Sequence, residues 1–154
     1  MDITSEFKFY LNKLFPMNRS LTGEQNRETL KIIKDIIPIK VHEYSSGSKV
    51  FDWVIPEEWN VVEAWVKNSK GEKVIDFNNS NLHLVSYSEP IQKKVSLEEL
   101  QKKLHFLEQI PEAIPYRTSY YSKDWGFCLS YNDYIGKVIN NPGDFEIFID
   151  CNFK

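Results

Sequence analysis

The sequence predicts an α+β fold, because the spacing of its apolar residues changes along the chain. Apolar residues recur at helical spacing through the first 38 residues, and a two-residue alternation follows from Ile39. A third helical segment begins near Ser96, and an apolar strand pattern occupies residues 145–150. Consecutive elements usually lie next to one another, so we expect the middle of the chain to form a small sheet.

Two short helices joined by a polar loop are expected at the start. In the first, apolar residues recur every three or four positions before Pro16, namely Ile3, Phe7, Leu11 and Leu14. Thr22 and Gln25 have the spacing of a capping box, which predicts that the second helix opens at Thr22. Pro38 ends this second helix.

The stretch after Ile39 is predicted to be rich in strands. Five short runs are expected to form strands, at 40–44, 50–55, 61–66, 73–77 and 82–87, and apolar residues alternate with polar ones in the first and the last of them. Residues 68–71 read Asn-Ser-Lys-Gly, which suits a hairpin loop of about four residues between the third and fourth runs.

A third helix is expected after Ser96, which forms a capping box with Glu99. Its buried stripe would consist of Leu100, Leu104 and Leu107.

The end of the chain is predicted to contain a strand at 126–130, a short helix at 133–140 and a last strand at 145–150. The last strand is apolar enough to promote aggregation as an uncovered edge. We therefore expect it either in the middle of the sheet or covered by further chain.

Composition favours a soluble cytoplasmic protein. The 154 residues carry a net charge of −3 with scattered Lys and Arg, which argues against nucleic acid as a partner. No apolar run approaches the roughly 20 residues that span a bilayer, so no membrane partner is expected. The acidic start does not resemble a signal peptide. Cys128 and Cys151 are expected to be reduced and buried, with a disulfide between them left open.

Catalytic and metal motifs are sparse. His42, His83 and His105 have no metal-type spacing, so structural or surface roles are expected for them. Cys128 lies between apolar residues, without a sign of an activated thiolate. The helix start near Thr22, with Arg19 beside it, could attract an anion, although an Arg paired with a neighbouring acid is the simpler interpretation.

The densest group of aromatic side chains lies at 116–127, among charged residues. These rings can form a platform for a carbohydrate or peptide, or they can fill the core of a small β-rich unit, and both interpretations stay open. The candidate substrate-binding residues are Arg19, Arg117, Tyr120, Tyr121 and Trp125. No catalytic residue and no metal ligand is assigned.

Four motifs carry a family resemblance. They are Phe15–Gly23 with Arg27–Leu30, Gly47–Trp53 with Pro56 and Glu58–Asn60, Leu82–Ser88, and Pro115–Tyr121 with Trp125–Cys128. Together they resemble the N-terminal part of bacterial aminopeptidase-like zinc proteins, a family with a domain of unknown function that is associated with polysaccharide biosynthesis. The resemblance covers essentially the whole chain.

The resemblance implies a partial α/β zinc-aminopeptidase-like core with an inserted small β-rich domain. Residues 1–55 and 131–154 would belong to the core, and residues 56–130, with one helix, to the insertion. The family's zinc ligands lie in segments beyond the last strand of this chain. The resemblance therefore implies zinc in full-length members and no cofactor held by this chain.

The expected function follows from this resemblance. The chain would be the N-terminal portion of a zinc-dependent aminopeptidase-like protein, inactive alone, whose inserted domain shapes the substrate cleft or an oligomer interface. The alternative is a non-catalytic saccharide- or peptide-binding module that uses segment 116–127. A homo-oligomer and a peptide or saccharide ligand are the expected partners.

Overall fold

The computed structural model describes residues 2–120 and 122–154, and these form an α+β structure. The chain divides into two compact units, each described by itself. The helical unit contains the residues up to Asn60 together with Asn152–Lys154, and the sheet unit contains Val61–Cys151. These units are not the predicted domains. The prediction that residues 56–130 are inserted into a core made of residues 1–55 and 131–154 stays a prediction.

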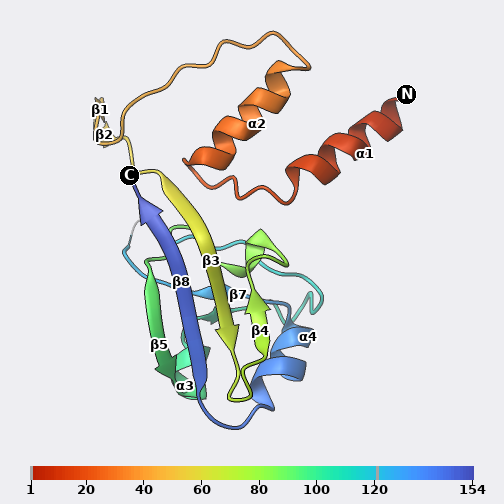
Figure 1. Ribbon diagram of the computed structural model, residues 1–154, viewed down its shortest axis with the longest axis vertical. Helices are drawn as coiled ribbons and strands as arrows, with labels where there is room; N and C mark the ends of the chain where they lie inside the picture. Colours follow the sequence, from red (N-terminus) through yellow and green to blue (C-terminus); the bar gives the residue numbers. More distant parts are fainter. Residues whose placement is uncertain (1, 121) are drawn as a thin grey trace. The chain divides into compact units, whose positions relative to one another are not determined.

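Both predicted helices of the helical unit are confirmed (Figure 1). Helix α1 spans Ile3–Leu14, and the carboxylate of its N-cap Asp2 accepts the backbone N–H of Thr4 at 2.9 Å. Helix α2 spans Glu24–Lys34. The predicted capping box is wrong, because the N-cap of α2 is Gly23, and the hydroxyl of Thr22 instead donates to the carbonyl of Glu57 at 3.0 Å.

Two strand predictions fail in the helical unit. Residues 40–44 have no regular structure, because the alternation there meets no partner strand among the described residues. The run at 50–55 is divided into a small hairpin, β1 (Lys49–Val50) paired antiparallel with β2 (Trp53–Val54). The turn between them places Phe51 at a φ of 56°, which breaks the extended backbone.

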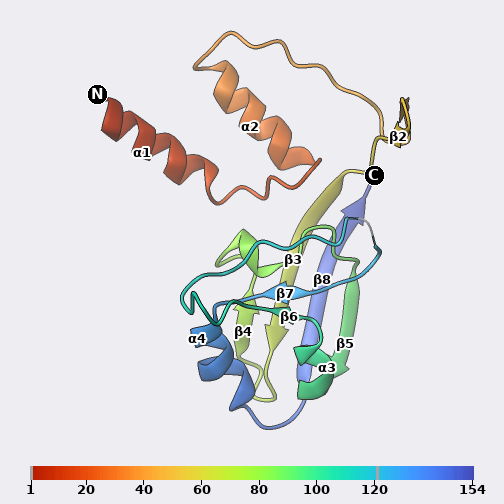
Figure 2. The ribbon, with the colours of Figure 1, turned by 180° about the vertical axis from the view of Figure 1, so that it is seen from behind.

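A four-stranded sheet with the order β4-β3-β8-β5 forms the framework of the sheet unit. Its strands are β3 (Trp59–Lys67), β4 (Lys73–Asp76), β5 (Ile91–Val95) and β8 (Phe145–Phe153). Both views show the long strand β8 between β3 and β5 (Figures 1 and 2). The last strand therefore lies in the middle of the sheet, which was one of the two positions expected for it. The edge strand β5 was not predicted.

Smaller elements cover one face of this sheet (Figure 2). They are α3 (Leu97–Gln101), the parallel pair β6 (Leu104–His105) and β7 (Phe127–Cys128), α4 (Tyr131–Asp133), and a π-helical turn, η2, at Tyr134–Ile139. Ser96 caps α3 as predicted, since its hydroxyl accepts the N–H of Glu99 at 3.2 Å. The predicted stripe is wrong, because α3 ends at Gln101 and Leu104 belongs to β6.

The strand predicted at 82–87 is also wrong. A 3₁₀ turn, η1, occupies Asn81–His83, and only isolated bridges follow, at Leu84 and Ser86.

The two units differ in how they bury apolar side chains. The sheet unit has a full core that includes Val66, Phe127 and Ile147, each without measurable exposure. Among the described residues of the helical unit, only Ile32 and Trp59 are buried apolar side chains. No helix in the described part of the chain is long and apolar enough to cross a membrane.

Candidate functional site

Two of the four motifs meet in the sheet unit. The backbone N–H of Ser86 donates to the carbonyl of Arg117 at 2.9 Å, and the N–H of Ser119 returns to the carbonyl of Ser86 at 2.9 Å. A third bond joins the N–H of Val85 to the carbonyl of Gly126 at 3.0 Å. Backbone pairing therefore sets segment 84–88 against both ends of the aromatic segment.

Tyr87 occupies a strained backbone conformation at this junction. Its φ is 66°, in the left-handed region that bulky residues rarely adopt. Its buried ring meets the ring of Tyr120 edge-on, with centroids 5.3 Å apart. The hydroxyl of Ser119 donates to the carbonyl of Tyr87 at 2.9 Å, so the strained residue is held from both its side chain and its backbone.

Two lysine ammonium groups lie close to the ring of Trp125. The Nζ atoms of Lys93 and Lys103 are 5.4 Å and 5.5 Å from its ring centroid, within the range of cation–π attraction. Lys103 also pairs with Asp124 at 2.6 Å, and this hydrogen bond lowers the pKa of Asp124. Asp124 accepts the backbone N–H of Trp125 at 2.8 Å, which anchors the half-buried indole.

The positive charge of Arg117, an exposed residue, acts on both His105 and Cys128. Burial, and then the positive charge of Arg117, lower the pKa of His105, so its imidazole is neutral at pH 7. Burial raises the pKa of Cys128 to about 12, so its thiol is not an activated nucleophile. The exposed Arg117 offers a donor for a carboxylate or hydroxyl, which suits binding better than bond cleavage.

His105 is the residue of this site that the sequence did not indicate. It lies in β6 directly opposite Cys128, within the pair of strands that includes part of the Trp125–Cys128 motif. A Cβ on Gly126 would lie 3.0 Å from the carbonyl of Lys103 and 3.5 Å from Nε2 of His105. This close approach explains the glycine and places the imidazole against it, a contact that no spacing in the sequence could reveal.

The predicted site residues divide between the units. Arg117, Tyr120 and Trp125 belong to the sheet unit, whereas Arg19 is an exposed residue of the helical unit. Tyr121 lies outside the described residues. The substrate-binding role of all five stays a prediction.

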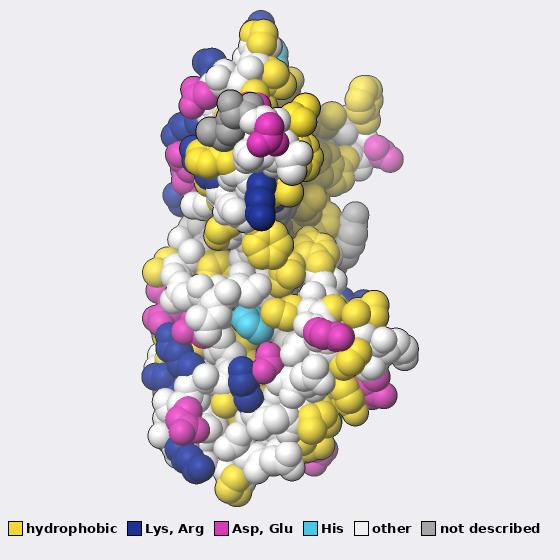
Figure 3. Space-filling view, turned by 90° about the vertical axis from the view of Figure 1, so that its right-hand side faces the viewer, with side chains coloured by type: hydrophobic (Ala, Val, Ile, Leu, Met, Phe, Trp, Pro, Cys, Tyr) yellow, Lys and Arg dark blue, Asp and Glu magenta, His cyan; other side chains and the backbone are white. Residues whose placement is uncertain are grey.

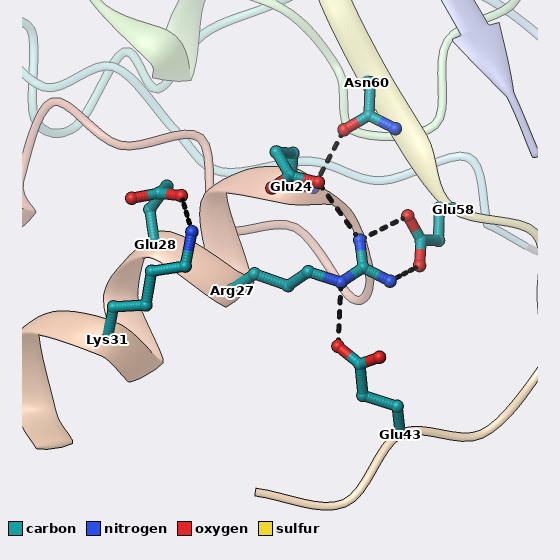
Figure 4. Close-up of polar contacts among 7 residues, drawn as sticks. All are labelled: Glu24, Arg27, Glu28, Lys31, Glu43, Glu58 and Asn60. Atoms are coloured by element: carbon teal, nitrogen blue, oxygen red, sulfur yellow. Dashed lines mark hydrogen bonds and ion pairs between the residues drawn. The ribbon is translucent and has the colours of Figure 1, made fainter.

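The first two motifs meet in the helical unit, where Arg27 binds three carboxylates (Figure 4). Its guanidinium pairs with both oxygens of Glu58, one of them at 2.8 Å, with Glu43 at 3.0 Å, and with Glu24 at 3.3 Å. These bonds lower the pKa of Glu58 and raise that of Arg27. The N–H of Glu24 also donates to the side chain of Asn60 at 2.9 Å. Arg27 therefore links helix α2 to the segment before β3.

The described side chains do not fit a zinc ion. No group of three or more His, Cys, Asp or Glu residues within 2–120 and 122–154 is placed to hold a metal. His83 illustrates the structural alternative, because its Nδ1 lies 2.8 Å from the carbonyl oxygen of Cys128. That this chain supplies no zinc ligand stays a prediction.

Comparisons with known proteins agree with the resemblance seen in the motifs. A relative from Clostridium acetobutylicum, named "Putative polysaccharide biosynthesis protein with aminopeptidase-like domain", is 46% identical over 144 residues, which are 94% of this chain and 32% of the relative. The crystal structure of a "putative peptidase" from the same organism matches with a TM-score of 0.89 and 45% identity, over 97% of this chain and 35% of that one. The chain thus spans about a third of the length of both. Residues 58–152 match a family model, and the chain belongs to that family, Domain of unknown function (DUF2172).

Proposed function

We propose that this chain is the N-terminal portion of a zinc-dependent aminopeptidase-like protein and is inactive by itself. One observation carries the proposal: 94% of the chain matches a protein with an aminopeptidase-like domain, yet covers only 32% of it. In this proposal the helical unit contributes to the peptidase-like core, and the zinc ligands come from the remaining polypeptide.

Zinc in the complete protein would polarise the scissile carbonyl and supply hydroxide at neutral pH. The residues described here do not fit that ion, so no hydrolytic step is assigned to them. Their proposed contribution is to bind and orient. The exposed Arg117, in the same segment as Tyr120 and Trp125, is suited to holding a polar end of a substrate.

An insertion that spans the sheet unit, Val61–Cys151, rather than the predicted residues 56–130, has support from the path of the chain. Strands β3 and β8, which begin and end the sheet unit, are neighbours in the sheet. Just outside that unit, the N–H of Glu58 donates to the carbonyl of Lys154 at 2.8 Å, and the reverse bond is 3.0 Å long. The chain therefore enters and leaves this unit at one place, as an insertion into another domain requires. In the complete protein the insertion would shape the substrate cleft or an oligomer interface.

The enzymatic proposal is tested with a chimera in which residues 1–154 replace the matched third of the Clostridium acetobutylicum relative. We expect the chimera to release N-terminal residues from peptides in a zinc-dependent reaction, and this chain alone to release none. Hydrolysis by this chain alone would overturn the proposal, and so would a folded, zinc-loaded chimera without activity on any aminoacyl substrate to which the unaltered relative responds.

A second function has its own supporting observation, the two ammonium groups close to the indole of Trp125. It would make the sheet unit a saccharide- or peptide-binding module. Glycan and peptide arrays probed with this chain test it: binding should be lost in Tyr120→Ala and Trp125→Ala. It should be kept in Tyr44→Ala, which removes an exposed ring from the other unit. Binding that survives all three substitutions would exclude segment 116–127 as the binding surface.

A further inference from the structure

Helix α1 presents an apolar stripe that nothing among the described residues covers. Ile3, Phe7 and Leu11 are spaced four apart and therefore share one face of the helix. Their exposed fractions are 81%, 67% and 56%, and no residue of α1 is buried. Figure 3 shows hydrophobic side chains gathered at several places on the surface.

A shallow, open hollow of about 450 Å³ lies along the stripe. It is lined by residues of α1 alone: Ile3, Thr4, Phe7, Lys8 and Leu11. An amphipathic helix of a globular protein normally turns such a stripe toward a core. An exposed apolar surface with a recess marks a place where other protein surface packs.

We propose that the α1 stripe (Ile3, Phe7 and Leu11) docks on the polypeptide that makes up the other two thirds of the longer family protein. This inference rests on the proposed function, because it assumes that the chain belongs to such a protein. It adds the surface of this chain that the remainder covers and the apolar character that the covering face must have.

The length of the relatives identifies the occupant. Nearly all of this chain matches a solved structure but covers only 35% of it, so that protein has ample further polypeptide. Lys154 belongs to the helical unit, where it pairs with Glu58. Under the proposed function, the remaining polypeptide therefore continues from the same unit that carries the stripe.

The charges of α1 argue against a membrane surface as the occupant. Helices that lie on anionic membranes carry an excess of Lys and Arg on their polar face. Here Asp2 and Glu6 accompany Lys8 and Lys13, so the helix and its cap have no such excess.

Thiol labelling at two positions of α1 tests the proposal. Phe7→Cys puts a thiol in the stripe, and Asn12→Cys puts one on the far side of the same exposed helix, as a matched control. Native Cys128 and Cys151 are buried and give a slow background. Maleimide labelling is timed in this chain and in the chimera with the relative. We expect Phe7→Cys to react at least about 50-fold more slowly in the chimera, and Asn12→Cys equally fast in both.

Each other result is decisive. Equal rates for Phe7→Cys in the chain and the chimera overturn the proposal. Protection that already appears in this chain, and grows with its concentration, assigns the stripe to a second copy and also overturns it. If the chimera does not fold, the same two labelling rates are measured with the equivalent pair of substitutions in the relative itself. Zinc content is measured separately, so a protected stripe in a zinc-free protein would leave this inference standing while the proposed function fails.

Discussion

Arg27 is the residue that joins the two motif segments of the helical unit. Its side chain is 35% exposed, so solvent screens part of its attraction to Glu58, Glu43 and Glu24. Bidentate geometry still distinguishes it from a loose surface pair.

Replacement of Arg27 by Gln should destabilise the helical unit by about 1 kcal/mol, because Glu58 loses two charge-assisted hydrogen bonds while solvent compensates in part. Amide hydrogen exchange along α2 is the measurement. Lys31→Gln is the control, since it removes an exposed pair with Glu28 on the same helix and should leave exchange unchanged. Equal effects of the two substitutions would show that Arg27 is an ordinary surface charge.

Acid should weaken the ion pair between Arg27 and Glu58. Arg27 lowers the pKa of Glu58 in the folded unit below its usual value of 4.5. Because the pKa of Glu58 is lowered on folding, the ion pair stabilises the fold fully above pH 4.5, the usual pKa. This contribution is lost as the pH falls from 4.5 through the lower pKa of the folded unit. We expect the difference in protection between the unaltered chain and Arg27→Gln to shrink below pH 4.5. A difference that stays constant down to pH 2 would contradict this assignment.

Gly23 is required by a close approach as well as by its backbone angle. Its φ is 142°, and a Cβ there would lie 2.8 Å from the carbonyl oxygen of Trp59. Gly47 has a φ of 79° with open space around it, so it provides a control for backbone strain alone.

We therefore expect Gly23→Ala to cost about 2–3 kcal/mol and Gly47→Ala about 1 kcal/mol, from thermal unfolding followed by circular dichroism. The larger cost should come with lost exchange protection at the start of α2. If the two substitutions cost the same, the contact with Trp59 does not constrain the chain.

At the scale of elements, β8 determines the stability of the sheet unit. Its alternate residues Phe145, Ile147 and Ile149 are buried, and the strand has a partner on each side. Ile147→Ala should destabilise the unit by about 3 kcal/mol through lost apolar burial and the cavity that remains. Urea unfolding measures this, with exposed Asp150→Ala in the same strand as a control expected to change little. A loss below about 1 kcal/mol for Ile147→Ala would place β8 outside the core.

Local patterns predicted the elements whose partners lie close in sequence or whose apolar content is high. Both long helices, the β3–β4 hairpin and β8 are of this kind. The alternation at 40–44 gave a false strand because a strand also needs a partner, which periodicity does not supply. The wrong stripe of α3 has a similar cause, since Leu104 is buried in β6 rather than on a helix. The edge strand β5 was missed because it contains Gln92, Lys93 and Lys94 among few apolar residues.

The sequence indicated which aromatic residues belong to the candidate site, but it did not indicate how they are arranged. Aromatic density pointed to Tyr120 and Trp125, and both lie in the segment that pairs with 84–88. That pairing joins residues more than 30 positions apart, and no local signal records it. His105 and the positive φ of Tyr87 depend on the same long-range contacts, so they became visible only in the folded chain.

At the scale of the whole molecule, the contrast between the units supports the proposed function. The sheet unit buries a complete core, whereas the helical unit leaves apolar side chains exposed on both helices and on the β1–β2 hairpin. A unit that buries little of its own apolar surface has the character of one part of a larger core. The proposal that zinc and catalysis come from the remaining polypeptide agrees with this difference.

Native mass spectrometry of this chain with added zinc tests the central claim most directly. The account predicts no tight, stoichiometric zinc adduct on residues 1–154, and a tight adduct on the chimera that adds the other two thirds of the relative. Stoichiometric zinc bound tightly by this chain alone would contradict it.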